Sequence, residues 1–590
     1  MKELYAEILR PKGADRKMFP ITFINVPSHK EIVMTVYPPV GILSMSSCLK
    51  QSGNKVNFID ADIHRLNPKQ VIELLKILPP QLIGISLNVS QVSHSVVYIE
   101  EIWRHFPNIP IILGGPYVTG VQEKIFKDFP LVRYAVIHEG EWAIKDFVDF
   151  LKGEKSIGEV RNLIYKINGR INRNKVERIL DLDSLPLPDY SLVLEYIDKY
   201  LGAYPSITSP SIAIMCTRGC PDNCAFCSSP VTWGRKVTFR KTDNIVNEIL
   251  DLKKTINVKE IFFQDDTLNA RPSWFFELCD KIISNGLHKE IFFKCPLKVN
   301  KEILSEELLR KAKEANFWMI FYGVESGNQE MLNNMNKNIT VEEIKRAFKL
   351  TREAGLASFA SFMIGNYGET RETVRDSMKL LKKIMPDYGG FAIAAPFPGS
   401  ELYRIAVEKK LITLTDFKKY QYGDCILKTD ALDTKDIMSL VGKANDLFDK
   451  LSRSLKHRII NRNDLFTKLI GEGFYEKEFW HTWVNRTMKN VSYILPTSTN
   501  AKNVHIKILA DYPDILERPV KFKLSINKIK YLVLIDKNEW IELKFPIIKH
   551  IDSRFIDIKW KVNRTWCPKK YKINEDKREL GVTVEKIWLA

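Results

Sequence analysis

The 590-residue chain has no run of 18 consecutive apolar residues, the length that a membrane-spanning helix needs. Its first residues, MKELYAEILRPKGADRK, lack the apolar run and the small-residue cleavage site of a secretory signal peptide. Cysteine is scarce and odd in number, and five of the nine stand alone: Cys48, Cys279, Cys295, Cys425 and Cys567. Because secreted disulfide scaffolds use paired cysteines, we expect a protein of the reducing cytoplasm.

The other four cysteines crowd into one loop, CTRGCPDNCAFC at 216–227, directly after the apolar run SIAIM. In a reducing compartment such a cluster predicts a metal site. Cys216 shares the strand parity of Ile212 and Ile214, which favours a place in the core. The predicted ligands are therefore Cys220, Cys224 and Cys227, which would hold a 4Fe–4S cluster and leave one iron open. A four-cysteine zinc site is the rival, although structural zinc usually takes two separated pairs.

Positive charge is concentrated near the end of the chain. The formal net charge is +18, and residues 451–590 hold 28 Lys or Arg against 16 Asp or Glu. The simplest interpretation is a solvated basic face. The alternative is an anionic partner such as phospholipid head groups, an acidic glycan or nucleic acid; we expect peripheral contact with an anionic surface and no nucleic acid.

Residues 18–150 alternate short apolar runs with segments of helical spacing. FPITFINVP, KVNFIDA, LIGISLNV and IPIILGG resemble strands, and GILSMSSCLKQSG, NPKQVIELLKIL and SVVYIEEIWRHF resemble helices. This pattern predicts an α/β domain with a doubly wound parallel sheet. Ligands bind such sheets at the carboxyl ends of the strands, here Asn25, Ser86 to Ser90 and Gly114 to Thr119.

The next part of the chain predicts a second sheet. YKINGRINRN indicates a hairpin with an Asn-Gly turn, and the proline-rich LDLDSLPLPDY an extended linker. Strand-like SIAIM, EIFFQDD, IFFKC, MIFYGVESG, ASFMIG and GGFAIAAPF then recur with helical segments between them, which predicts a partial TIM-like (βα) barrel whose site lies at the carboxyl ends of its strands. Asp265 and Asp266 end one of these strands, where contact with a ligand or helix capping would both be natural.

The predicted domains are a ligand-binding domain at 1–155, a linker at 156–205, the barrel at 206–420 and a helical connector at 421–470. An antiparallel β-sandwich at 471–590 follows, predicted from alternating runs such as VKFKLSI, WIELKF and FIDIKWKV.

The motifs resemble those of cobalamin-dependent radical S-adenosylmethionine (SAM) enzymes of the methyltransferase type. CxxxCxxC, GVESG with MNKNIT, FMIGNYGET and PFPGSELY occur in that order, and YPPVG, GGPYVT and HEGE resemble the cobalamin-binding domain that precedes the barrel. Tyr117 and His138 depart from the commoner residues of that domain. The resemblance implies SAM-binding roles for Phe226, Asp265, Glu325, Ser326, Gly365, Pro398 and Gly399, and cobalamin-binding roles for Asn25, Gly41, Ser86, Ser90, Gly114, Gly115, Thr119, Glu139, Gly140 and Glu141.

The same resemblance implies three cofactors: a 4Fe–4S cluster, SAM and cobalamin. Cluster and SAM would generate a radical, and cobalamin would carry a methyl group from SAM to an unactivated carbon, with flavodoxin or ferredoxin as electron donor. His29 and His64 lie in loops that lack an Asp-x-His-x-x-Gly motif, so base-off cobalamin without a protein imidazole is expected. Radical chemistry without methylation remains an alternative.

The tail from GFYEKEFWHTW onward resembles a β-sandwich module of bacterial enzymes that build surface polysaccharides. This resemblance favours a glycan, lipid or other small-molecule substrate. Trp480, Trp483 and Trp566 could stack on sugars, and a place in the core is the alternative for each. A non-catalytic glycan-binding or scaffold protein is the remaining hypothesis.

Overall fold

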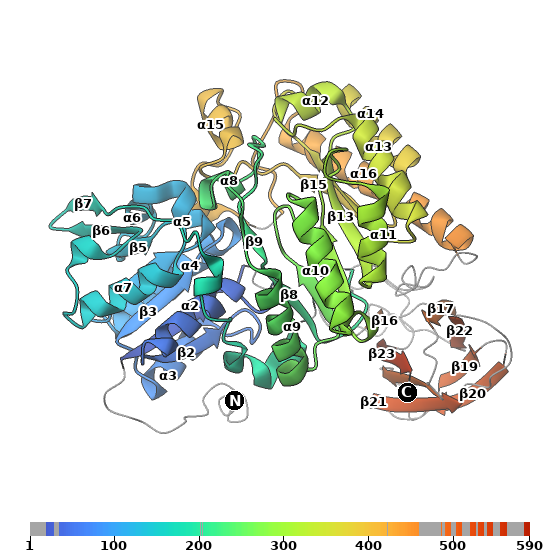
Figure 1. Cartoon of the computed structure of the whole chain (residues 1–590), viewed down its shortest axis with the longest axis horizontal. Helices are drawn as coiled ribbons and strands as arrows, with labels where there is room; N and C mark the ends of the chain where they lie inside the picture. The colour runs from blue at the N-terminus through green and yellow to red at the C-terminus, as the bar shows by residue number, and fades with distance from the viewer. Residues whose placement is uncertain are drawn as a thin grey trace, which may run out of the picture. The chain divides into compact units, whose positions relative to one another are not determined.

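The computed structural model describes residues 19–28, 35–200, 202, 205–421 and 423–459, together with strands β16 to β23 farther along the chain. It contains two compact units, Met1–Ser454 and Leu455–Ala590 (Figure 1). Helix α16 (Thr434–Ile459) extends across the boundary between them. No helix in the described part of the chain is long and apolar enough to cross a bilayer.

The first sheet of the larger unit has seven strands in the order β2-β1-β3-β4-β5-β6-β7. Their bounds are β1 Pro20–Asn25, β2 Lys55–Asp60, β3 Leu82–Ser86, β4 Ile111–Gly114, β5 Tyr134–Val136, β6 Leu163–Ile167 and β7 Arg170–Arg173. The first five strands are parallel. The hairpin β6–β7 is antiparallel and turns at Asn168 and Gly169, both with positive φ, as the Asn-Gly pair predicts.

Helices connect the parallel strands and bury the sheet. They are α2 (Val40–Gln51), α3 (Pro68–Ile77), α4 (Val92–His105), α5 (Pro116–Val121), α6 (Ile125–Asp128) and α7 (Glu141–Leu151). Local sequence fixes the start of α3, because Asn67 caps this helix in a reciprocal capping box with Gln70. The doubly wound prediction is confirmed. The strand order places the ligand crevice at the carboxyl ends of β1 and β3.

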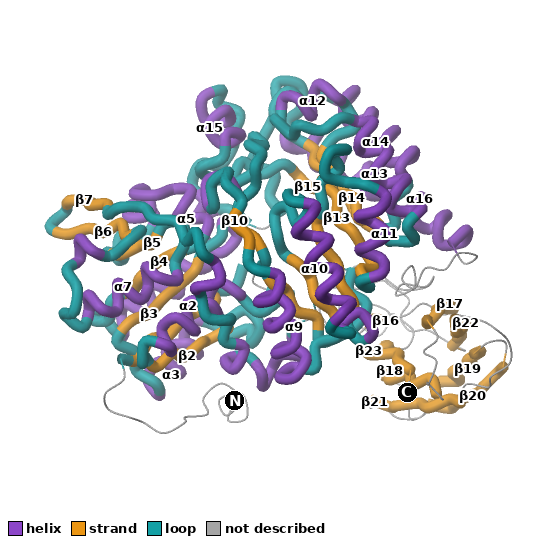
Figure 2. The backbone as a smooth tube through the Cα atoms, viewed as in Figure 1, coloured by secondary structure: helices purple, strands orange, loops and turns teal. Residues whose placement is uncertain are grey.

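The second sheet is the predicted partial barrel, which Figure 2 shows as strands alternating with helices. Its six parallel strands lie in the order β15-β14-β13-β12-β11-β8. Their bounds are β8 Ser211–Ile214, β11 Glu260–Phe263, β12 Phe292–Pro296, β13 Phe317–Glu325, β14 Ala357–Ile364 and β15 Tyr388–Ile393. The helices of this part are α8 Ser229–Thr232, α9 Thr242–Ile256, α10 Pro272–Ser284, α11 Glu306–Glu314, α12 Gln329–Asn334, α13 Val341–Glu353, α14 Arg371–Ile384 and α15 Glu401–Glu408.

Alternate residues of the barrel strands serve different faces. On the outer face Phe263, Phe293 and Phe317 pack together and meet Phe275 of α10. At the amino end of the barrel, the side chains of Glu260 and Lys294 are fully buried, with Glu260 Oε1 2.7 Å from Lys294 Nζ. Glu260 also accepts hydrogen bonds from Ser206, Ile207 N and Ser211, while Lys294 donates to the Pro205 carbonyl. The linker is thereby fixed beneath the barrel.

The C-terminal unit contains two four-stranded antiparallel sheets, ordered β16-β23-β18-β21 and β17-β22-β19-β20. The strands are β16 Asn485–Arg486, β17 Asn490–Pro496, β18 Asn503–Leu509, β19 Val520–Ile526, β20 Ile529–Ile535, β21 Trp540–Pro546, β22 Phe555–Val562 and β23 Thr583–Leu589. In β19, Val520, Phe522, Leu524 and Ile526 are buried and alternate with outward residues. The antiparallel prediction is confirmed. His29, Trp480, Trp483, Trp566 and Cys567 lie outside the described residues.

Candidate cofactor sites at the domain interface

The cysteine loop follows β8 at the carboxyl end of the barrel, as predicted. Cys220, Cys224 and Cys227 are each partly exposed, whereas Cys216 is fully buried in the core. The loop is held at its centre, because Ala225 N donates to the Met335 carbonyl and Leu402 N to the Ala225 carbonyl. Burial raises the pKa of the Cys224 thiol to about 11. Exposure therefore distinguishes the three candidate ligands from Cys216, which belongs to the core.

Two lysines accompany the three thiols. Burial lowers the pKa of Lys337, yet the charges of Glu325 and Cys224 outweigh it, so that this pKa is raised overall. Lys298 forms an ion pair with Asp222 inside the cysteine loop, and burial lowers its pKa overall although the charge of Cys220 acts to raise it. A cluster bound by three thiolates is anionic, and buried cations next to it offset that charge. The residues present therefore fit an iron–sulfur cluster.

Within the described residues there is no group of three or more His, Cys, Asp or Glu side chains arranged around a single metal ion. In a cubane cluster each cysteine binds a different iron atom, so the three sulfurs need not converge on one point.

Glu325, a predicted SAM-binding residue, occupies a strained position at the end of β13. Its φ is 60°, a left-handed conformation that is rare outside glycine and that concentrates at functional sites. Its Oε1 accepts a hydrogen bond from Lys337 Nζ at 3.0 Å. Gly323 makes room for this pair, since a Cβ there would lie 2.5 Å from Glu325 Oε1. The adjacent Ser326 is fully buried and its hydroxyl lies 3.4 Å from that of Ser377.

Asp265 and Asp266 have different surroundings. Asp265 Oδ1 accepts hydrogen bonds from the backbone N–H groups of Cys216 and Thr217 and from the Thr217 hydroxyl, so it fixes the start of the cysteine loop. Burial raises its pKa to about 7. Asp266 binds the hydroxyl of Ser229, whose N–H donates to Cys227 Sγ. Asp265 therefore holds backbone groups of the cysteine loop and caps no helix, and its contact with a ligand stays a prediction.

The other predicted SAM residues form tight turns around the barrel mouth. Phe226 lies under the ammonium of Lys337, 5.6 Å from its ring centroid. Gly365 has a φ of 98° and donates its N–H to Glu369 Oε2 at 2.6 Å. Pro398 and Gly399 pack against Gly120 of α5, where a Cβ would stand 2.1 Å from the Pro398 carbonyl oxygen. Backbone of the barrel thus touches backbone of the first domain.

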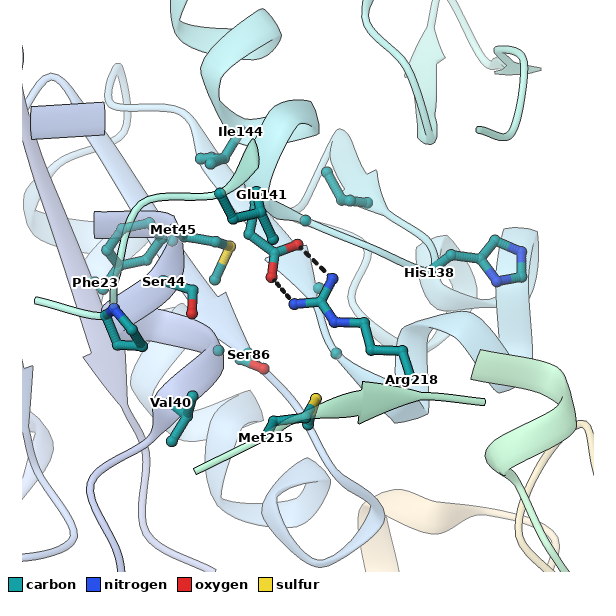
Figure 3. Close-up of a pocket in the computed structure, with 18 of the residues that line it drawn as sticks. Phe23, Val40, Ser44, Met45, Ser86, His138, Glu141, Ile144, Met215 and Arg218 are labelled. Carbon is teal, nitrogen blue, oxygen red and sulfur yellow. Dashed lines mark hydrogen bonds and ion pairs between the residues drawn. The ribbon is translucent and has the colours of Figure 1, made fainter. Parts of the chain in front are cut away.

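A cavity of about 290 Å³ lies at the carboxyl edge of the first sheet (Figure 3). Its deep walls are apolar and include Phe23, Met45, Ile112, Val136 and Ile144. Six of the ten residues predicted to bind cobalamin line it: Gly41, Ser86, Gly114, Gly115, Gly140 and Glu141. At Gly41 a Cβ would meet nothing within 4 Å. Gly41 therefore leaves space in the wall that a side chain would occupy, whereas a Cβ at Gly140 would lie 2.9 Å from Met45 Sδ.

The other four predicted cobalamin residues do not line this cavity. Asn25 donates to Thr35 and Asp60 in a buried network beyond the end of β1. Thr119 accepts a hydrogen bond from His138 N, and the Ser90 hydroxyl donates to Asn88. Glu139 accepts from Arg218 and from Ile179 N.

Arg218 connects the cavity with the cysteine loop. It is buried between two carboxylates of the first domain, 2.7 Å from Glu139 Oε1 and in a closer contact with Glu141, and Figure 3 shows Arg218 and Glu141 pointing toward one another. Its guanidinium also lies 4.9 Å from the centroid of the Trp233 ring. Arg218 precedes Cys220 by two residues, and Thr232 and Trp233 follow Cys227; all three line the cavity. Residues on both sides of the three cysteines therefore form part of its wall.

Two family models match the chain: "B12 binding domain" over residues 33–148 and "Radical SAM superfamily" over residues 214–381. The chain combines the two domains that characterise cobalamin-binding radical SAM enzymes. It is 29% identical to an uncharacterized methyltransferase of Pyrococcus horikoshii over 417 residues, which are 70% of this chain and 88% of that protein.

Two further likenesses are to a cyclase and to another methyltransferase. The radical SAM enzyme is 27% identical to the anaerobic magnesium-protoporphyrin IX monomethyl ester cyclase of Rubrivivax gelatinosus, over 69% of this chain and 72% of the cyclase. Its fold is shared with the radical SAM methyltransferase TsrM from Kitasatospora setae, at a TM-score of 0.56 and 17% identity, covering 67% of this chain and 77% of TsrM.

The cofactors of this radical SAM enzyme are SAM, a 4Fe–4S cluster and cobalamin. The cavity fits part of a cobalamin molecule, which is larger than the space enclosed, because apolar walls and bare backbone suit a bulky ligand with an extended tail. Arg218, Lys298, Lys337 and Trp233 were not predicted as site residues. Only the position of Arg218 inside the motif and of Lys337 inside MNKNIT gave a signal for them.

Proposed function

We propose that this enzyme transfers a methyl group to an unactivated carbon of a small molecule. The observation that carries the proposal is that the segment from Arg218 to Trp233 contains the three candidate cluster cysteines and, at its two ends, lines the cavity proposed for cobalamin. When bound, the cluster and SAM supply hydrogen abstraction and cobalamin supplies a transferable methyl group. Close, fixed placement of the two sites is what such coupled chemistry requires.

The residues of the chain would divide this work. Cys220, Cys224 and Cys227 would hold the cluster, and Lys298 and Lys337 would offset its charge. Glu325, Ser326, Phe226 and the Gly365 turn would surround SAM at the barrel mouth. Gly41, Ser86, Gly114, Gly115 and Gly140 would accept cobalamin against the backbone.

We propose further that cobalamin binds base-off without a protein imidazole. His64 does not line the cavity; its ring contacts Tyr196 at a centroid distance of 4.4 Å. His138 lines the cavity, but its Nδ1 lies 3.2 Å from the carbonyl oxygen of Thr232.

The test is the mass of the product formed by the reconstituted enzyme from candidate substrates with SAM labelled in its methyl group. Methyl transfer predicts a labelled product that is heavier by one methylene unit, with 5′-deoxyadenosine and S-adenosylhomocysteine formed together. The second candidate is cyclisation or oxidation, favoured by the likeness to the cyclase. A product that is lighter by hydrogen atoms and carries no label would establish this second candidate and refute methylation.

The C-terminal unit would bring the enzyme to an anionic phospholipid surface. In the sheet that contains β19 and β20, Lys521, Lys523 and Lys530 are exposed, and so are Leu532 (64%) and Leu534 (57%). Lys521 faces Leu534 across the strand pair, and Lys523 faces Leu532. Lysines next to exposed leucines suit a membrane interface, where cations meet head groups and apolar side chains enter below them.

The full-length protein should therefore bind vesicles of equal parts phosphatidylglycerol and phosphatidylcholine, and this binding should weaken as salt rises. K521Q/K523Q/K530Q should reduce it by about a hundredfold, since each lysine near an anionic surface contributes roughly 1 kcal/mol. The control K175Q/K349Q/K379Q removes the same charge from exposed lysines of the larger unit. Equal effects of the two triple variants in a sedimentation assay would refute a specific surface.

A further inference from the structure

Four aromatic rings from four separate segments form a continuous row in the barrel. Tyr37, from the segment before α2, stacks on Phe262 of β11 with ring centroids 5.8 Å apart. Phe262 meets Phe321 of β13 at 5.2 Å, and Phe321 meets its register partner Phe359 of β14 at 4.8 Å. These four residues are called the aromatic row below. Such spacing is that of favourable ring contacts.

The row lies on the inner face of the barrel sheet. Its immediate sequence neighbours, such as Ile261, Phe263, Ile320 and Tyr322, belong to the core beneath the helices, and strand residues alternate between faces. Phe262, Phe321 and Phe359 remain half-buried, although the phenylalanines of the outer face are fully buried. The inner rings therefore face space that protein does not fill.

The barrel is closed below the row and accessible above it. Lys294 lies 5.8 Å from the centroid of the Phe262 ring, and its ion pair with Glu260 seals the amino end. In the other direction, Gly323 and Glu325 follow Phe321 at alternate positions of β13, so the row lies roughly 13 Å from the Glu325–Lys337 pair. A molecule resting on the row would thus extend toward the cysteine loop.

The inner face between the row and the barrel mouth is mostly apolar or bare. Its alternate positions are Gln264 directly after β11, Pro296 on β12, Gly323 on β13, Ser361 and Met363 on β14, and Gly390 and Ala392 on β15. Two neutral polar side chains are too few for a saccharide, whose many hydroxyls would be left without partners, and burying unpaired hydroxyls is costly. A hydrocarbon surface has no hydrogen bonds to lose when it is buried there, and it gains contacts with the aromatic rings.

We infer that the inner face of the barrel binds an apolar part of the substrate, a hydrocarbon chain or a fused hydrocarbon ring system, on the aromatic row. The carbon that reacts then belongs to this apolar part, and any sugar or charged group of the substrate lies outside the row. The inference rests on the proposed radical function and narrows its substrate from the glycan or lipid alternatives to the lipid-like class.

The test uses octyl glucoside, below its micelle concentration, in two labelled forms: one with a perdeuterated octyl chain and one with deuterium on the carbons of the glucose ring. The holoenzyme is reduced with SAM, and 5′-deoxyadenosine is analysed by mass spectrometry. Deuterium in 5′-deoxyadenosine marks the half of the probe that lies next to the site of hydrogen abstraction. We expect deuterium from the octyl chain at least tenfold above deuterium from the glucose ring.

Variants of one residue connect this result with the row. Phe359→Asn should lower deuterium transfer from the octyl chain about tenfold, because a polar amide replaces a buried apolar contact, and Phe359→Leu should keep most of it. Phe276→Asn, which makes the same exchange at a half-buried phenylalanine of the outer helix α10, is the matched control and should leave transfer unchanged. Cluster absorbance and SAM cleavage without probe report whether each variant is folded. If Phe359→Asn does not fold, Phe359→Leu still allows a comparison with the wild type.

Unchanged SAM cleavage with deuterium coming mainly from glucose, or from neither half, would overturn the inference while leaving the radical function intact. Absence of 5′-deoxyadenosine in the wild type would instead refute the proposed function itself.

Discussion

Alanine at Cys220, Cys224 or Cys227 is expected to abolish reductive cleavage of SAM. Each thiol is accessible on the loop, and a cluster with only three protein ligands has none to spare. Losing a residue that merely supports a metal ligand typically costs 10- to 100-fold, so loss of a ligand itself should exceed about 100-fold. The measurement is formation of 5′-deoxyadenosine by anaerobically reconstituted protein, with the iron content and the cluster absorbance of each variant.

Cys216→Ala supplies the comparison within the same motif. Cys216 is fully buried, and burial raises the pKa of its thiol well above the usual range, so it is poorly suited to act as a thiolate ligand. This variant should retain its cluster and cleave SAM at close to the wild-type rate. If it loses iron as completely as Cys220→Ala does, the assignment of ligands is wrong.

Arg218→Met should lower the free energy of unfolding of the larger unit by about 3–5 kcal/mol and weaken cobalamin binding. The substitution keeps a long apolar stem but leaves Glu139 and Glu141 buried without their cation, and breaking a buried ion pair from one side has this cost. Thermal unfolding measures the first effect. Titration with hydroxocobalamin, followed by its absorption spectrum, measures the second.

Two controls separate the effect of the buried ion pairs of Arg218 with Glu139 and Glu141 from general effects of charge. R218M/E139Q/E141Q removes the stranded carboxylates and should recover much of the lost stability, because neutral groups cost less to bury. Arg404→Met breaks ion pairs to Glu401 and Glu408 at the surface and should leave the unfolding temperature nearly unchanged. Arg218→Met behaving like Arg404→Met would show that these buried ion pairs do not hold the domains together.

Both sheets of the larger unit and their helices could be predicted from the sequence, because the signals for these elements are local. Periodic apolar residues, the Asn168–Gly169 turn and the capping box at Asn67 each act within a few residues of the chain. The connector was harder to delimit. Helix α16 extends from Thr434 to Ile459, inside the predicted 421–470 segment, while the compact units divide at Ser454.

The site was predicted less completely, because its central interactions join distant residues. Glu139 and Glu141 stand in a motif that suggested cobalamin, yet their partner Arg218 lies 79 and 77 residues away, and no periodicity reports such a pair. Likewise the run EIFF has apolar residues on both faces. Only the register of the folded sheet shows that Phe263 enters the core and Phe262 the barrel interior.

The contact of Gly120 with Pro398 and Gly399 restricts how the enzyme can move. Backbone atoms are in contact at this point and no side chains lie between them. No deformable side chains are therefore present to accommodate a change in the angle between the first domain and the barrel. The two domains should accordingly behave as a single block during turnover, so cofactors and substrate must exchange by motions of loops. Inserting one methyl group by Gly120→Ala would act as a wedge, and its effect would appear first in the spacing between the two cofactors.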